Sequence, residues 1–290
     1  MKCIFFGSTG YLGKHLIYSL RREGNDVTVP LSLSGSRLDL TQSNSLEKID
    51  WNVDAVYLFA GLTGTGVSFD QYERFLYGNE LVLLNVLNSI RKSQSRPRVM
   101  FPSTRLIYHG SDTPLSEDDV KECKTVYSVN KAACESYLYA FSNAFDIPYT
   151  ILRVCVPYAN MLDEEYSYGT IGNFIKQAKG KRRIQLYSGG GVRRTFTHIE
   201  DFCRITISLT ECHNATNQIY NIPGEDLSLY EAAAMIAARF GAIVESIDYP
   251  SFESRLESGS TVFKGNRVFD TLKTSIRHSF SNWVSAIPLI

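Results

Sequence analysis

The 290-residue sequence predicts an α/β protein with a doubly wound parallel sheet, and three observations support this fold class. An apolar run at residues 3–6 leads into a glycine turn and then into an apolar helical pattern that ends at Gly24. A second apolar run at residues 26–31 follows at once and completes a β-α-β opening. Strand and helix patterns then keep alternating up to residue 156. Because β-α-β units cross over with a right hand, this alternation predicts parallel strands in a doubly wound sheet.

The later elements follow from the same patterns. We expect strands near residues 53–60, 98–104 and 149–156, with helices near 70–92 and 127–145 between them. After Pro157 come a polar loop, a helix near 170–179, a strand near 182–187 and a helix near 228–240. This change predicts a first domain of residues 1–157, with interleaved segments near 190–222, and a smaller α/β domain mainly of residues 158–290. We expect the smaller domain to cover the carboxyl edge of the sheet, where open α/β folds bind ligands.

Composition excludes several classes of partner. With 30 basic and 30 acidic residues the chain has no net charge that would attract nucleic acid or an anionic membrane. The six cysteines form no CxxC pair and no cysteine-histidine cluster with zinc spacing, which predicts buried reduced thiols and no metal site. The longest apolar run, residues 55–62, is too short to span a bilayer, and the amino terminus lacks a signal-peptide core. We therefore expect a cytoplasmic protein.

The glycine turn, Gly7-Ser-Thr-Gly10-Tyr-Leu-Gly13, lies between the first strand and the first helix. The first glycine permits a tight turn, the second lets a phosphate approach the backbone, and the third lets the helix pack closely on the strand. The amino terminus of the helix would then face a pyrophosphate. The turn therefore predicts a dinucleotide site in the first domain.

The segment after the second strand bears on which dinucleotide binds. NAD sites usually place an acid there for the ribose 2′-hydroxyl, whereas this chain has no carboxylate before Asp39. A 2′-phosphate could instead be held by Ser34, Ser36 or Arg37. The sequence thus favours NADP(H) and leaves NAD(H) open.

Tyr127 and Lys131 stand four residues apart at the start of a predicted helix, so their side chains leave the same face. A lysine charge about 4 Å from the phenol is worth about 4 kcal/mol at an effective dielectric near 20, and it lowers the tyrosine pKa. Such a tyrosine can give a proton to a carbinol oxygen or take one from it. Ser103 and Thr104, at the end of the strand near 98–104, are the hydroxyls that could orient that oxygen.

These motifs together resemble the extended short-chain dehydrogenases/reductases, the nucleotide-sugar epimerase, dehydratase and reductase group, over about residues 2–240. GSTGYLG is similar to the cofactor turn of the family, LFAG (58–61) to its motif beside the nicotinamide ribose, STRLIYH (103–109) to S[ST]xxVYG, and YSVNK (127–131) to its catalytic pair. The resemblance implies a Rossmann-type fold and catalysis by Thr104, Tyr127 and Lys131, with Ser103 also at the substrate. The implied cofactor contacts are Gly7, Thr9, Gly10, Tyr11, Leu12, Gly13, Arg37, Asp39, Leu40, Phe59, Ala60, Gly61, Asn79, Tyr127 and Lys131.

A second resemblance lies in residues 191–201, which are similar to the family motif G-x-x-R-[DT]-F-x-H-V-x-D. It implies that Arg194 clamps the diphosphate of a nucleotide-diphosphate sugar, because its planar fork meets phosphate oxygens in pairs. It also implies that His198 packs against the core. The family usually dimerises, here through the helices near 70–92 and 127–145, so a homodimer is expected.

Departures from the family pattern narrow the reaction. Arg105 and Leu106 stand where 4,6-dehydratases carry Asp-Glu, and no cysteine lies between residues 101 and 109, where the epimerase-reductases need one. Two reactions remain: NADPH-dependent reduction of a 4-keto-6-deoxy sugar, which the missing acid favours, and NAD-dependent 4-epimerisation. A catalytically silent NADP-sensing protein is the alternative from another class. The nucleotide base, the sugar and the stereochemistry at C4 stay open.

Overall fold

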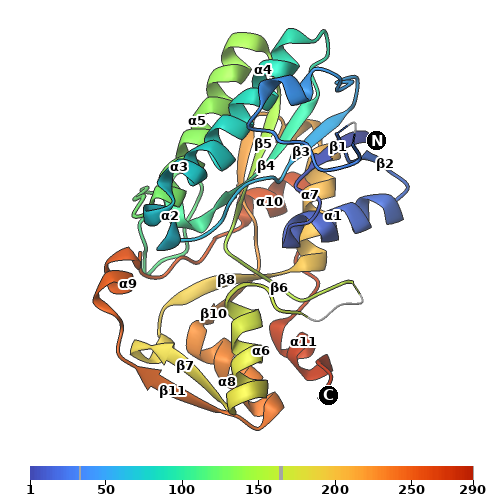
Figure 1. Ribbon diagram of the computed structural model, residues 1–290. Helices are drawn as coiled ribbons and strands as arrows, with labels where there is room; N and C mark the ends of the chain where they lie inside the picture. The colour runs from blue at the N-terminus through green and yellow to red at the C-terminus, as the bar shows by residue number, and fades with distance from the viewer. Residues whose placement is uncertain (33, 163–165, 290) are drawn as a thin grey trace. The chain divides into compact units, whose positions relative to one another are not determined.

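The computed structural model describes residues 1–32, 34–162 and 166–289 (Figure 1). They form two compact units, each of which has its own sheet structure. Unit 1 consists of Met1–Ile107, Glu122–Arg153 and Thr206–Tyr220, and unit 2 of Tyr108–Lys121, Val154–Ile205 and Asn221–Ile290. The assignment of a first domain to the cofactor and a second to the sugar stays a prediction.

Unit 1 is built on a six-stranded sheet of order β2-β1-β3-β4-β5-β9. Its strands are β1 (Lys2–Phe6), β2 (Asp26–Thr28), β3 (Ala55–Leu58), β4 (Arg98–Thr104), β5 (Tyr149–Val154) and β9 (Gln218–Asn221). β1 pairs in parallel with β2 and β3, and β3 pairs in parallel with β4, which confirms the predicted parallel sheet. β2 ends at Thr28 rather than near Leu31; Pro30 has no backbone N–H to donate to a strand ladder.

Helices cover both faces of this sheet (Figure 1). On one face α4 (Val82–Lys92) and α5 (Val126–Phe145) bury an apolar cluster that contains Ile4, Val56 and Val99 from the strands. On the other face lies α1 (Tyr11–Arg22), which buries Leu16 and Leu20. Successive strand residues point to opposite faces, so both faces of the central strands are apolar, as expected for a doubly wound sheet.

The helix predicted near 70–92 is interrupted. It consists of α2 (Val67–Asp70), α3 (Tyr72–Phe75), a π-helical segment η2 (Leu76–Leu81) and α4. π-helical turns occur frequently at functional sites because the extra residue redirects a side chain. Here the segment carries Asn79, whose Oδ1 accepts a hydrogen bond from Leu62 N at 3.0 Å.

Unit 2 contains two smaller sheets. One has the order β10-β8-β6, with β6 (Val156–Tyr158), β8 (Arg193–His198) and β10 (Glu225–Ser228), and the other pairs β7 (Arg183–Tyr187) with β11 (Ile243–Ile247). The strand predicted at 149–156 is therefore two strands of different sheets. The helices are α6 (Gly169–Lys181), α8 (Leu229–Phe240), α9 (Ser251–Leu256), α10 (Asn266–Leu272) and α11 (Phe280–Ala286). Rings of Tyr158, Phe196 and Trp283 pack around Phe280 and form its aromatic core.

The described part of the chain contains one further helix and four 3-10 turns. The helix α7 (Ile199–Glu211) begins directly after β8, and the turns are η1 (Ser43–Leu46), η3 (Arg105–Ile107), η4 (Ser188–Gly190) and η5 (His213–Ala215). All six cysteines are free thiols; three are buried as predicted, but Cys123, Cys155 and Cys212 are partly exposed, so their predicted burial was wrong. Among the residues that the structure describes, no helix is long and apolar enough to cross a membrane.

Candidate active site

The glycine turn has the geometry that its sequence predicts. Gly7 has φ +90°, and a Cβ there would lie 2.3 Å from Ala60 N, so the position accepts only glycine. A Cβ on Gly13 would lie 2.1 Å from Gly7 O, which shows that the third glycine allows α1 to pack against the turn. A Cβ on Gly10 would meet only an ordinary contact of 3.6 Å with Gly7 O. Packing within the protein therefore does not require glycine at position 10, whereas a phosphate at the amino terminus of α1 would.

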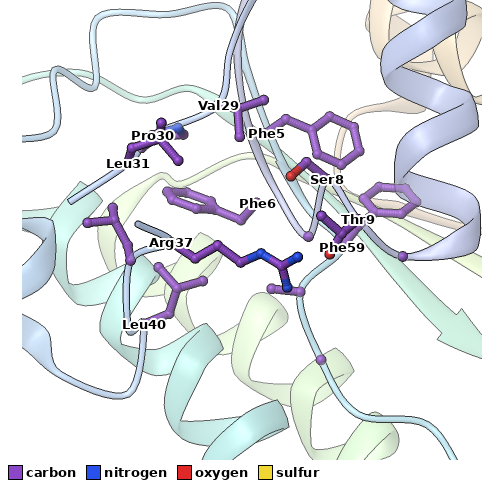
Figure 2. A pocket seen from close by; sticks show the side chains of 15 residues that line it. Phe5, Phe6, Ser8, Thr9, Val29, Pro30, Leu31, Arg37, Leu40 and Phe59 are labelled. Carbon is purple, nitrogen blue, oxygen red and sulfur yellow. The ribbon is translucent and has the colours of Figure 1, made fainter. Parts of the chain in front are cut away.

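A cavity of about 340 Å³ opens beside this turn, within unit 1 (Figure 2). Its wall consists of the end of β1, the turn itself, the segment after β2 and the segment after β3. Eight of the predicted cofactor residues line it: Gly7, Thr9, Gly10, Arg37, Leu40, Phe59, Ala60 and Gly61. Tyr11, Leu12 and Gly13 form the first turn of α1. A second cavity of about 580 Å³ is lined by Asp39, Leu40, Ala60 and Gly61, among others, so it shares wall residues with the first.

Polar groups suited to phosphate are present at Arg37, which lines the first cavity, and in the loop just before it. Figure 2 shows the Arg37 side chain extending across the cavity toward the glycine turn at Thr9. The hydroxyls of Ser32, Ser34 and Ser36 lie 2.7–3.0 Å from one another in the exposed loop before Arg37. The Asp39 carboxylate instead accepts bonds from the N–H and the hydroxyl of Thr41, at 3.0 and 2.6 Å. These residues fit a dinucleotide, because a glycine cradle, a helix amino terminus and a cation meet at one cavity.

The Tyr-Lys pair lies in the first turns of α5. The helix starts with a capping box in which Thr125 and Ser128 bond each other's backbone, and this fixes Tyr127 in the first turn. Tyr127 is buried, with its ring edge-on to Phe75 at 6.3 Å. Lys131 is also buried, and its Nζ donates to Pro102 O at 2.8 Å.

The environment of Lys131 alters its acidity. Burial lowers the pKa of Lys131 to about 8, and the neighbouring Cys134 and Glu135 oppose that shift by favouring the ammonium form. The ammonium also lies 4.4 Å from the centre of the Phe101 ring, which favours its positive charge. Lys131 can therefore stay charged at neutral pH although it is buried.

The end of β4 holds the two predicted hydroxyls. Thr104 is buried, and its Oγ1 accepts a hydrogen bond from Leu106 N at 3.2 Å, which leaves its O–H proton for another acceptor. The hydroxyl of Ser103 donates to Glu135 Oε1 at 2.5 Å. The Ser103 proton is thus already used inside unit 1, whereas that of Thr104 is suited to a substrate oxygen. The substrate roles of both residues stay predictions.

The sequence did not predict the contacts of two residues in this region, Glu135 and Arg153. Arg153 on β5 donates to Glu135 twice, from Nε at 3.0 Å to Oε1 and from NH2 at 2.6 Å to Oε2. The sequence offers one signal for Glu135, because this carboxylate stands four residues after Lys131 and so lies on the same helical face. Nothing in the sequence pairs Arg153 with it, because β5 follows α5 in the chain and meets it only in the folded unit.

Arg194 lies in unit 2, on β8, and is almost completely buried. Its NH1 donates to Arg193 O and Gly259 O, at 2.9 and 2.6 Å, and its NH2 forms an ion pair with Glu257 Oε1 at 2.6 Å. The predicted diphosphate role stays a prediction, and a diphosphate would compete with Glu257 for this cation.

Unit 2 also has a cavity of its own, about 520 Å³ in volume. The amides of Asn173 and Gln185 line it, together with Tyr187 and Tyr249, whose rings stack at 4.8 Å. Aromatic faces and side-chain amides together suit a flat, polar ring.

His198 belongs to a clamp at the start of α7. Its ring stacks on that of His278 at 4.1 Å, and His278 contacts Glu200 at 2.7 Å and Asp201 at 3.2 Å. Burial, together with the nearby His278, lowers the pKa of His198 to about 4. The potential ligand atoms of His198, Glu200 and His278 lie within 4.8 Å of one another, but the nearly parallel rings and the contacts of His278 with two carboxylates favour a hydrogen-bonded cluster over a metal site. Sequence spacing does not reveal this cluster, because 80 residues separate the two histidines in the chain.

Known proteins are similar to this chain in sequence and in fold. The chain is 24% identical over 246 residues to the UDP-N-acetyl-alpha-D-glucosaminuronate decarboxylase of Bacillus cytotoxicus, which covers 78% of this chain and 75% of that protein. It is 22% identical to UDP-glucuronate 4-epimerase 1 of Arabidopsis thaliana, over 68% of this chain and 52% of that protein.

Among solved structures, the UDP-glucuronic acid 4-epimerase from Bacillus cereus, in complex with UDP-glucuronic acid and NAD, superposes with a TM-score of 0.83 at 21% identity. The alignment covers 99% of this chain and 97% of that one, so the whole fold is shared. Residues 4–223 also match the family described as the NAD dependent epimerase/dehydratase family. Since this match covers well over half of the chain, the protein belongs to the NAD dependent epimerase/dehydratase family.

Proposed function

We propose that the protein is a 4-epimerase of a UDP-sugar that uses a tightly held NAD. The observation that carries this proposal is the buried Tyr127–Lys131 pair, whose lysine contacts the end of β4 in the same unit as the dinucleotide cavity. Proteins similar in sequence and in fold are named for 4-epimerisation or decarboxylation of UDP-sugars, which favours the epimerase over net reduction.

In this reaction Tyr127 would take the proton of the sugar O4 hydroxyl and later return it to the same oxygen. Lys131, one helical turn further along α5, would place a positive charge on the same helical face as Tyr127. Thr104 would donate its hydroxyl proton to O4 and so hold the reacting carbon in place. A nicotinamide dinucleotide held at the glycine turn would supply hydride acceptor and donor chemistry at C4, and inversion would require the sugar ring to present its other face between the two transfers.

The substrate would be held in unit 2. The cavity with the stacked Tyr187 and Tyr249 fits a pyrimidine ring, and Arg194 would meet the diphosphate once Glu257 moves aside. A homodimer is proposed on the exposed apolar side chains of η2 and α5, such as Tyr77, Val129 and Tyr139, because apolar side chains at helix surfaces favour a protein partner.

A second candidate is the NADPH-dependent 4-ketoreductase. Arg37 in the cavity wall, and a segment between β2 and Asp39 without any carboxylate, support binding of a 2′-phosphate. The same Tyr127, Lys131 and Thr104 would then deliver a proton to a 4-keto oxygen.

The test begins with the purified protein and its absorption spectrum, which shows whether a nicotinamide dinucleotide stays bound. UDP-glucuronic acid, UDP-glucose and UDP-N-acetylglucosamine are then incubated separately and their C4 epimers separated by chromatography. Epimer formation without added cofactor is expected. Oxidation of NADPH by a 4-keto-6-deoxy nucleotide sugar, with no epimerisation, would select the reductase instead.

Replacing Tyr127 by Phe separates an enzyme from a silent dinucleotide-binding protein. Tyr127→Phe should lose about 10²- to 10⁴-fold in turnover, because a proton donor and acceptor is removed. Its dinucleotide affinity should remain within about twofold of the unchanged protein. Unchanged turnover would contradict the role proposed for this tyrosine.

A further inference from the structure

A buried chain of three side chains lies behind the proposed reaction site. The Ser103 hydroxyl donates to Glu135, and Arg153 holds both carboxylate oxygens of Glu135. The side chains of Arg153 and Glu135 are only 3% and 10% exposed, and Ser103 is 5% exposed. A buried ion pair with a third hydrogen-bond partner holds its members in one arrangement, because leaving any of these groups unpaired is costly.

The chain of contacts reaches the same strand end as the catalytic lysine. Lys131 and Glu135 are one helical turn apart on α5, and they contact consecutive residues of β4: Lys131 bonds Pro102 O, and Glu135 bonds the Ser103 hydroxyl. Thr104 follows directly as the last residue of β4. Two side chains of one helix therefore fix the strand end from which the Thr104 hydroxyl projects.

We propose that Glu135, held by Arg153, is a positioning residue. It accepts the hydrogen bond of the Ser103 hydroxyl and fixes the end of β4, so that Thr104 presents its own hydroxyl to the sugar oxygen. This role rests on the proposed function. It assigns different tasks to two adjacent hydroxyls, since a Glu135 oxygen 2.5 Å from the Ser103 hydroxyl accepts the hydrogen bond that this serine would otherwise donate to a substrate.

The Glu135 carboxylate also favours the protonated, positively charged form of Lys131. Glu135 raises the Lys131 pKa against the effect of burial. Other charged or titratable groups near this part of α5 include Cys134 beside Lys131, Arg153 on β5, which pairs with Glu135, and Glu80 on η2, which bonds Asn130 and Tyr137. Cys123 and Tyr149 also lie near Glu135. Glu135→Gln would remove an anion and leave Arg153 in place, so Lys131 would lose its proton at a lower pH.

The test uses the full chain with Glu135→Gln and Ser103→Ala, and with Ser136→Ala on the exposed face of the same helix as the control. For each protein we would measure the thermal unfolding midpoint, NAD affinity, and kcat and KM for the UDP-sugar across pH 6–10.

We expect kcat to fall about 10- to 100-fold in both test variants, because misplacing a reacting group by about 1 Å has an effect of that size. KM and NAD affinity should stay within about threefold of their values in the unchanged protein. In Glu135→Gln the decline of kcat at alkaline pH should begin at a lower pH. A folded Glu135→Gln or Ser103→Ala protein with unchanged kcat would overturn the proposal.

Glu135→Gln could unfold the protein, because it leaves the Arg153 charge buried and unpaired. The double variant Glu135→Met, Arg153→Met removes both charges and should fold; loss of kcat in it supports the proposal, and full kcat overturns it. Hydrogen exchange of the backbone amides in residues 98–107, the segment that contains β4, can be measured without any substrate. If the unchanged protein epimerises nothing but this segment exchanges faster in both variants, the proposed function fails while the positioning contact stands. Unchanged exchange overturns the contact.

Discussion

The most direct test of the cofactor turn compares alanine at two of its glycines. A Cβ at Gly13 would lie 2.1 Å from Gly7 O, whereas ordinary contact begins at 3.4 Å, so α1 and the turn must separate by about 1.3 Å. Overpacking of this kind destabilises a protein by about 1–3 kcal/mol. For a chain of this size each kcal/mol lowers the thermal midpoint by about 2–4 °C, so Gly13→Ala should melt about 2–12 °C lower.

Gly10→Ala should behave differently although it lies only three residues away. Its Cβ would meet Gly7 O at an ordinary 3.6 Å, so we expect the melting temperature without cofactor to be unchanged. The same methyl group would stand where the pyrophosphate approaches the backbone, and NAD affinity should fall at least about tenfold, which corresponds to about 1.4 kcal/mol.

The assay is thermal unfolding followed by circular dichroism, with and without NAD, together with calorimetric titration of NAD. Gly180→Ala in α6 is the control: no atom lies within 4 Å of its Cβ position, and alanine should stabilise the helix by up to about 1 kcal/mol. If Gly13→Ala melts like the unchanged protein, or if Gly10→Ala binds NAD with full affinity, the roles assigned to these glycines are wrong.

Three further predictions concern charged side chains. The folded His198 has a pKa of about 4, below its ordinary value of 6.5, so the unfolded chain binds this proton first as the pH falls. Stability should therefore decline from about pH 6.5 to pH 4, and His198→Asn should show a smaller decline in urea unfolding. Arg98 NH1 donates to the carbonyls of Leu209, Thr210 and Cys212, at 2.8–3.0 Å, so Arg98→Met should lower the free energy of unfolding by about 2–4 kcal/mol. If Arg37 reads a 2′-phosphate, Arg37→Met should weaken NADPH about 10- to 100-fold and leave NADH unchanged in calorimetric titration.

An exposed arginine serves as the control for Arg98. Arg183→Met, at a side chain 51% exposed, should change stability by less than about 1 kcal/mol. Equal pH profiles for His198→Asn and the unchanged protein would contradict the assigned pKa. A fully stable Arg98→Met would show that water replaces its bonds. Equal losses for NADPH and NADH would remove the evidence for 2′-phosphate recognition.

Local sequence was sufficient for the main features of unit 1. The glycine turn, the Tyr127–Lys131 pair and the strand at 98–104 were predictable, because each depends on residues close together in the chain: a strand-turn-helix junction, a spacing of four on a helix, and an apolar run. Chain spacing could not predict the interruption of the helix at 76–81, since a π-helical turn carries no distinct composition.

Only the tertiary structure decided which distant groups meet. It brings Arg153 of β5 to Glu135 of α5 and so gives Ser103 and Thr104 different hydrogen-bond roles, and it pairs Arg194 with Glu257, 63 residues away. Such pairings depend on which strands and helices pack together. Once the charged groups are buried, each needs its partner, because an unpaired buried charge costs folding free energy. The sequence alone therefore determined the fold class, the glycine turn after β1 and the placement of Tyr127 and Lys131 at the start of α5. The hydrogen bonds that orient these groups were decided by the packing of elements far apart in the chain.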